Sequence, residues 1–276
     1  MNKKKRKLSV IRFIGTLILA ILFFVPFALV IYNSVKPQKQ IMTDILGWPI
    51  ELRLENYRNA WVELGLQNAM RNSVVVTFAS LLLILLLSSM VAYWFVRHPS
   101  KISRIIEKIL ISSLLIPFAS VMLPLAKTMG NLGLNKSLFG GILTYTGMGI
   151  SFASFILSGA VRTLPLEVEE AAMIDGCNIF QVFFKIVIPM LIPSLLSVFI
   201  LDLFWIWNDY IVALVMLNIP QLNTVPLVIS KLFGLYANKW DLSLPAIVMS
   251  IIPILVINIS MQKRIVVGMT AGAVKG

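Results

Sequence analysis

Long apolar runs alternate with short polar segments along almost the whole chain. Six of these runs are long enough to cross a hydrocarbon core, which takes about 20 predominantly apolar residues in a helix. Their approximate boundaries are 10–32, 73–96, 105–126, 138–161, 190–217 and 244–261. The pattern predicts an all-α integral membrane protein with six transmembrane helices, because a helix satisfies its own backbone groups in lipid.

The fifth run is longer than one span requires and contains polar residues. Asp202, Asn208 and Asp209 all lie within it. Carboxylates at membrane depth are costly and usually face a cavity or a partner. We therefore expect this helix to tilt or break.

Composition agrees with a membrane protein rather than a soluble domain. Hydrophobic residues make up 58% of the 276 residues and charged residues 13%, against roughly half and a quarter in average soluble proteins. A single cysteine, Cys177, excludes a disulfide framework and a cysteine metal cluster. A single histidine, His98, argues against a histidine metal site and a Ser-His triad. The sequence predicts no metal site, no cofactor and no enzymatic activity.

The net charge of +12 follows the predicted topology. If the amino terminus is cytoplasmic, most of the 24 lysines and arginines lie in cytoplasmic segments, which is the bias that orients membrane proteins. We therefore predict that both termini are cytoplasmic and that the chain binds no nucleic acid. A signal peptide also begins with basic residues, but the first apolar run is too long and has no Ala-x-Ala cleavage site.

The longest polar break between apolar runs has the residues of a helical hairpin. Pro165 suits a first helical position. Gly176 can adopt the left-handed conformation that ends a helix, and Asn178 with Gln181 can form a capping box for a second helix. We predict a helix, a glycine turn and a second helix that ends where Pro189 begins the next apolar run.

This break resembles the coupling loop of ABC importer permeases. The resemblance rests on an acidic-Ala-Ala stretch, an Asp-Gly pair and a later Ile-Pro pair: Glu169, Glu170, Ala171, Ala172, Asp175, Gly176, Ile188 and Pro189. In that family the loop is a cytoplasmic knob that docks in a groove of a separate ATPase subunit and transmits its closing motion to the membrane helices. The resemblance implies this coupling role here; an amphipathic surface hairpin without a partner is the alternative.

Three other segments resemble sugar-uptake permeases in particular. Asn72-Ser73 begins the second run, where an Asn-Ser pair opens the transport core of such permeases. Trp-Asn-Asp at 207–209 and Thr-Val-Pro-Leu at 224–227 resemble the family's Trp-Asn-acid and Thr-Leu-Pro patterns. Residues 268–276 closely resemble the Gly-Leu-Thr-Ala-Gly-Gly-Val-Lys-Gly terminus of maltose-type permeases. The resemblance covers about 72–276.

Membership in this family would imply a larger assembly in a bacterial cytoplasmic membrane. Its parts would be a second, related permease in a heterodimer, two ATPase subunits and an extracellular solute-binding protein that delivers a sugar or oligosaccharide. The expected domains are 1–71, with the first span and an external segment, and a core at 72–262 that holds the coupling loop at about 163–189. A cytoplasmic tail at 263–276 follows.

Four residues near the end of the fifth run are candidates for the translocation pathway: Asp202, Trp205, Asn208 and Asp209. Aromatic rings can stack on a sugar, and carboxylates can accept hydrogen bonds from its hydroxyls. For Asp209, contact with water or the capping of a backbone N–H is the alternative.

Two other function classes are weaker. A secondary transporter or channel would need a coupling-ion site and inverted repeats; Asp202 and Asp209 are its only candidate ligands, and we find no repeat. A membrane enzyme would need an H-E-x-x-H pair or a nucleophile–base pair, and neither is evident.

The segment 130–137 nearly matches a phosphate-binding loop, but Asn135 replaces the second glycine and no strand precedes it. Any ATP energy must therefore come from a partner.

Two further segments have patterns that predict local structure. The external segment 33–72 mixes aromatic and acidic residues and predicts one or two short amphipathic helices. The fourth run has small residues at helical spacing, Gly149 with Ala153 and Ser154 with Ser158. Such pairs allow close helix packing, either within this chain or against a second permease.

Overall fold

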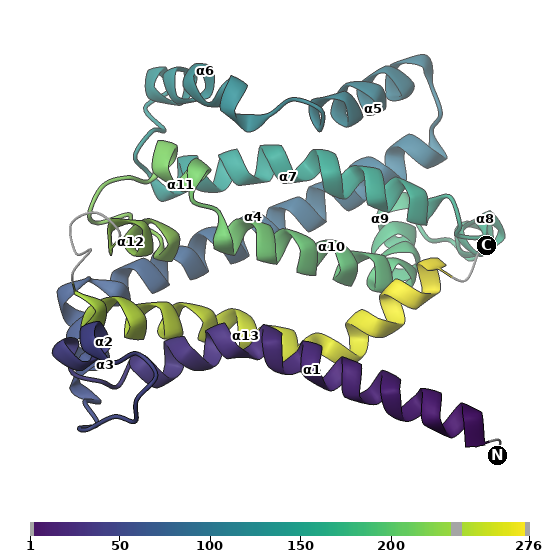
Figure 1. Ribbon diagram of the computed structural model, residues 1–276. Helices are drawn as coiled ribbons and strands as arrows, with labels where there is room; N and C mark the ends of the chain where they lie inside the picture. Colours follow the sequence, from purple (N-terminus) through teal and green to yellow (C-terminus); the bar gives the residue numbers. More distant parts are fainter. Residues whose placement is uncertain (1–2, 233–238, 274–276) are drawn as a thin grey trace. The chain divides into compact units, whose positions relative to one another are not determined.

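The computed structural model describes the backbone at 3–232 and 239–273, and the side chains at 12–232 and 239–261. Within these ranges every regular element is a helix (Figure 1). The chain divides into two compact units, Met1–Gln67 with Val228–Pro253, and Asn68–Leu227 with Ile254–Gly276. We call them unit 1 and unit 2 and describe each by itself.

The helices follow one another along the chain in this order: α1 Lys3–Asn33, α2 Gln38–Thr43, α3 Glu55–Glu63, α4 Leu66–Arg97, α5 Lys101–Ser113, α6 Phe118–Asn131, α7 Leu138–Val161, α8 Leu166–Ile174, α9 Ile179–Val182, the π-helix η1 Phe183–Val187, α10 Ile188–Asn208, α11 Ile211–Met216, α12 Val225–Leu232 and α13 Trp240–Ala273. Five stretches of the described chain are long and apolar enough to cross a membrane: Arg12–Asn33, Leu66–Arg97, Leu138–Val161, Ile179–Asn208 and Trp240–Met261.

The third predicted span is not a single helix, which corrects the expectation for 105–126. Helices α5 and α6 meet at an angle of 109° across a short break. Pro117 stands at that break, directly before α6. Its ring disfavours the helical conformation at the preceding residue, so a helix usually ends there. The described chain therefore has six spans only if this bent pair crosses the membrane as one.

The fifth span breaks near its end, as predicted, but begins earlier than expected. Asp209 and Tyr210 separate α10 from α11. At the other end, α9 continues through η1 into α10, so Pro189 lies inside a continuous helical run and does not begin a new element. Proline has no backbone N–H to donate, and a local π-helical turn allows the helix to continue past it. The second helix of the predicted hairpin is thus the first turn of the fifth span.

The segment that follows α1 in unit 1 contains two short helices, α2 and α3, as predicted. It is held together around a buried lysine. The Nζ of Lys36 donates to the carbonyls of Asp44, at 3.1 Å, and Ile45, at 2.9 Å, and lies 4.3 Å from the ring centroid of Tyr32. Nδ2 of Asn56 donates to the carbonyls of Ser34 and Lys36. These bonds fix the segment to the end of α1.

Unit 2 is built around α7, which contacts α5, α10 and α11. Gly149 allows a close approach to α4, because a Cβ added there would clash with the side chain of Ile84. Ala153, Ser154 and Ser158 are also buried. These four small residues therefore pack within the chain, which decides for them the alternative that the sequence left open.

Two of the segments that carry the family resemblance meet at one end of unit 2. Nδ2 of Asn72 donates to the carbonyls of Gln221 and Asn223. Oγ of Ser73 accepts from the backbone N–H of Val225 at 2.9 Å. The Asn-Ser pair thus anchors the start of α4 to the Thr-Val-Pro-Leu segment.

Most of the segment expected to be a cytoplasmic tail has a helical backbone. Helix α13 continues through this segment to Ala273. Residues 274–276 of the predicted tail lie outside the described residues.

Candidate functional site

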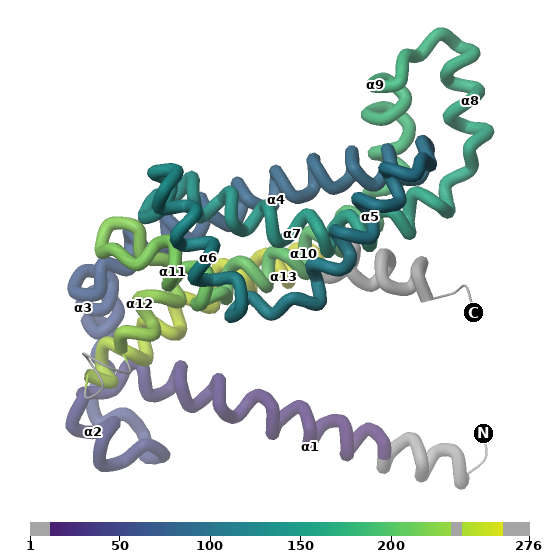
Figure 2. Tube along the Cα trace, turned by 90° about the horizontal axis from the view of Figure 1, so that it is seen from above, coloured from purple at the N-terminus to yellow at the C-terminus, as the bar shows by residue number. Residues whose placement is uncertain are grey.

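The polar break folds as the hairpin that the sequence predicted. Helix α8, a turn at Gly176 and helix α9 project from one end of unit 2, beyond the ends of α4 and α7 (Figure 2). Asn178 and Gln181 form the full capping box, each side chain accepting from the other residue's backbone N–H. We call Leu166–Val182 the α8–α9 hairpin.

The backbone conformation at position 176 requires glycine, whereas the space around it does not. Its φ is +88°, in the left-handed region, and a Cβ added there would meet no neighbouring heavy atom within 4 Å. A β-branched residue at this φ is strongly disfavoured. The turn between the two helices therefore depends on the backbone freedom of glycine.

The structure separates two adjacent glutamates that the sequence treats alike. Glu169 is only 2% exposed. Its Oε1 accepts from Nη2 and Nε of Arg97 at 2.6 and 2.9 Å, and its Oε2 accepts from the hydroxyl of Tyr93 at 3.0 Å. Glu170 is exposed at the surface of the hairpin. Only Glu170 is free to meet a partner directly, whereas Glu169 holds the hairpin to the end of α4.

Arg97 and Tyr93 are the functional residues that sequence reasoning missed. Both lie on the last turns of α4, four residues apart, so they share one face of that helix. Nη2 of Arg97 also donates to the carbonyl of Leu164, just before α8. We refer to Tyr93, Arg97 and Glu169 as the hairpin anchor. The chain separations of 72 and 76 residues leave no local signal for it.

The surface of the hairpin combines apolar and acidic side chains. Ile174 is 86% exposed and Phe180 is 64% exposed, while Glu167, Glu170 and Asp175 are exposed around them. Large apolar side chains rimmed by charge are typical of a surface that docks onto another protein. Of the other predicted coupling residues, Ala171 and Pro189 are exposed, and Ala172 and Ile188 are half-buried.

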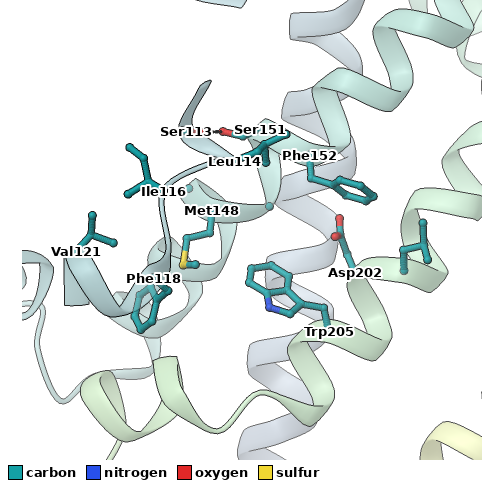
Figure 3. Close-up of a pocket in the computed structure, with 13 residues that line it drawn as sticks. Ser113, Leu114, Ile116, Phe118, Val121, Met148, Ser151, Phe152, Asp202 and Trp205 are labelled. Atoms are coloured by element: carbon teal, nitrogen blue, oxygen red, sulfur yellow. Dashed lines mark hydrogen bonds between the residues drawn. The ribbon is translucent and has the colours of Figure 1, made fainter. Parts of the chain in front are cut away.

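A second candidate site is a pocket of about 510 Å³ in unit 2, lined by residues of α7 and α10 and of the break between α5 and α6. Asp202 and Trp205, predicted for the pathway, both line it (Figure 3). Asp202 is 3% exposed, and its Oδ2 has no hydrogen-bond partner within the described chain. Figure 3 shows its carboxylate between the side chains of Phe152 and Trp205.

Asn208 and Asp209 are not among the residues that line this pocket. Nδ2 of Asn208 donates to the carbonyl of Phe204 within α10. Oδ1 of Asp209 accepts from the hydroxyl of Tyr145 at 2.9 Å and from the N–H of Val212 at 2.8 Å. Asp209 therefore caps the start of α11, the alternative considered from the sequence.

Comparisons with known proteins agree on one family. Residues 84–263 match the family described as "Binding-protein-dependent transport system inner membrane component". The chain is 35% identical, over the full length of both chains, to the "Probable starch degradation products transport system permease protein AmyC" of Thermoanaerobacterium thermosulfurigenes. It is 31% identical to the "Melibiose/raffinose/stachyose import permease protein MelC" of Bacillus subtilis, over 94% of each chain.

The fold also has a close counterpart among solved structures. A chain from the "Crystal structure of a bacterial ABC transporter involved in the import of the acidic polysaccharide alginate" superposes with a TM-score of 0.82. The match covers 95% of this chain and 98% of that chain, at 20% sequence identity. At that identity the likeness shows a shared fold.

Proposed function

The chain belongs to the family of inner-membrane components of binding-protein-dependent transport systems, and we propose that it is a permease subunit of an ATP-driven carbohydrate importer. Its several apolar spans make it a multi-pass membrane protein of that family. A sugar or oligosaccharide as substrate is supported by relatives whose names specify starch degradation products and melibiose, raffinose or stachyose.

The observation that carries the proposal is the anchored hairpin with an exposed apolar and acidic surface. A docking knob needs both a surface for a partner and a rigid link to the membrane helices, and the hairpin anchor provides that link. We propose that the surface docks on a separate ATPase subunit, with Glu170 facing a basic residue of its groove.

Family membership supports proposals for the remaining partners and for the pathway. We propose that two ATPase subunits, a second permease and an extracellular solute-binding protein complete the assembly. The translocation pathway would pass the pocket of unit 2, where Asp202 and Trp205 lie. Asn208 and Asp209 stay predictions for the same pathway, and Asp209 has a structural role in addition.

The energy source tests this function against a secondary transporter. The assay uses proteoliposomes that contain the whole assembly, with ATP inside, because an importer moves its solute from the side of the binding protein to the side of the ATPase. With the solute-binding protein outside, labelled maltotriose or raffinose should accumulate when ATP is inside. Proton or sodium gradients without ATP should give none. Accumulation driven by either gradient alone would instead support a secondary transporter.

We further propose that both termini and the α8–α9 hairpin are cytoplasmic, because most lysines and arginines then flank the spans on the cytoplasmic side. The bent pair α5 and α6 would cross the membrane once. In that arrangement Lys101 lies inside and Leu132 outside.

Thiol labelling checks this topology at the two ends of the bent pair. In a Cys177→Ser background, an impermeant maleimide added to right-side-out vesicles should label Leu132→Cys but not Lys101→Cys. Both wild-type side chains are exposed in the structure, so exposure does not bias the comparison. Permeabilised vesicles should label both variants equally. Labelling of neither variant in sealed vesicles would place both ends of the pair inside and make it a re-entrant loop rather than a span.

A further inference from the structure

The pocket in unit 2 places one acidic group and two hydroxyls in a mainly apolar wall. Oγ of Ser113 donates to Oγ of Ser151 at 2.9 Å, which joins α5 to α7 across the pocket wall. Asp202, by contrast, has a buried oxygen without a partner in the described part of the chain. The volume of about 510 Å³ lies within the range of about 300–1,000 Å³ that is usual for small-molecule sites.

An unpartnered carboxylate at this depth points to a ligand. Asp202 lies six residues before the end of α10, which is about 9 Å along the helix. A buried polar group without a hydrogen bond is costly, and intramembrane carboxylates face a cavity or a partner. An ionised carboxylate only accepts hydrogen bonds. The matching ligand therefore brings several donors of its own, as the hydroxyls of a saccharide do.

Trp205 supplies an aromatic surface beside the Asp202 carboxylate, and a neighbouring ring limits the motion of its indole. The ring of Tyr145 meets it edge-on, with centroids 5.8 Å apart and planes at 76°. The Tyr145 hydroxyl is itself held by Asp209. A braced indole offers a large contact area at little cost in conformational entropy. Asp209 thus acts on the pocket through Tyr145 and Trp205, without lining it.

We propose that this pocket is a saccharide subsite, in which Asp202 accepts hydrogen bonds from sugar hydroxyls and disfavours sugars that carry carboxylates. The inference rests on the proposed function. It adds that this subunit itself contacts the substrate and that it selects neutral over acidic saccharides, because two like charges in a poorly solvated pocket repel each other.

The helix α7 provides a reporter and a matched control for this subsite. Gly147 lines the pocket, and a Cβ added there would meet no neighbouring atom within 4 Å. Gly159 on the same helix is equally open and is not among the pocket residues. In a Cys177→Ser background, Gly147→Cys and Gly159→Cys can therefore be alkylated by a small neutral reagent in the purified complete assembly.

Neutral saccharides should protect only the cysteine in the pocket. Maltotriose or raffinose is expected to slow alkylation of Gly147→Cys about fivefold at about four times its Kd, since protection follows 1 + [L]/Kd. Alkylation of Gly159→Cys should not change. Trigalacturonate, an acidic trisaccharide, should protect Gly147→Cys far less than the neutral sugars.

Removing the charge of Asp202 should change both results. Asp202→Asn is expected to raise the half-protecting concentration of the neutral sugar about tenfold, the effect of losing a hydrogen bond to a charged group. Asp202→Asn should also reduce the difference between the protection given by neutral sugars and the protection given by trigalacturonate. Thr146→Val is the control, because its hydroxyl is likewise buried without a partner but lies outside the pocket lining; protection should be unaffected by it.

Two outcomes would overturn the inference. One is equal protection by trigalacturonate and neutral sugars; the other is ATP-driven uptake of the neutral sugars without any protection of Gly147→Cys. In both, the proposed function can still stand. An assembly that takes up neither maltotriose nor raffinose with ATP, but does take up a solute of another class, would contradict the proposed function as well.

Discussion

Replacing Glu169 with glutamine is expected to destabilise the chain and free the α8–α9 hairpin, whereas Glu170→Gln should leave stability unchanged. Glu169 accepts from both Arg97 and Tyr93 in a buried site. Removing one partner of a buried ion pair leaves the other charge uncompensated, which costs about 3 kcal/mol. The measurement is the thermal unfolding midpoint of the detergent-purified chain, with the adjacent, exposed Glu170 as matched position.

A paired substitution tests whether the stability lost by Glu169→Gln comes from the unpaired charge that it leaves on Arg97. Exchanging Arg97 and Glu169 together for leucine should recover part of the stability lost by Glu169→Gln, because no unpaired charge is left behind. The double variant should nevertheless transport poorly if the anchor transmits motion to α4. Equal midpoints for Glu169→Gln and Glu170→Gln would contradict the role assigned to the anchor.

Reversing the charge of Glu170 is expected to abolish transport without disturbing the fold. The side chain is exposed on the hairpin, so Glu170→Lys should insert and unfold as the wild type does. Contact between close charge pairs at interfaces is worth about 1.5–7 kcal/mol, so repulsion there should weaken ATPase docking by at least about tenfold. Co-purification of the ATPase and ATP-driven uptake both measure this loss. In both assays Glu170→Gln should give a value between those of the wild type and Glu170→Lys.

Features set by local chemistry could be predicted from the sequence. The capping box of Asn178 and Gln181 and the left-handed turn at Gly176 depend only on neighbouring residues, and the structure has both. A tilt or a break in the fifth run was also predicted, because polar residues interrupt that run, and the structure has a break after Asn208. The break at Pro117 was missed even though proline is a local signal. The break was missed because the residues 105–126 were judged by their average hydropathy, which is high on both sides of Pro117.

Features set by packing could not be predicted. Glu169 and Glu170 have the same chemistry and adjacent positions, and only the orientation of α8 against α4 makes one buried and the other exposed. From the sequence, Asp202 and Asp209 were both candidates for the pathway, and backbone capping was an alternative for Asp209 only. One faces a pocket without a partner, while the other is held by Tyr145 and the start of α11. Both distinctions depend on residues far apart in the chain.

The most direct test of the central claim, that the hairpin couples this chain to a separate ATPase, is a charge exchange across the proposed interface. ATP-driven uptake is measured for Glu170→Lys alone and for Glu170→Lys combined with an acidic residue in place of the basic residue of the ATPase groove. Uptake is expected to be lost in the first assembly and partly restored in the second. Normal uptake by Glu170→Lys alone would show that the hairpin is only a surface feature.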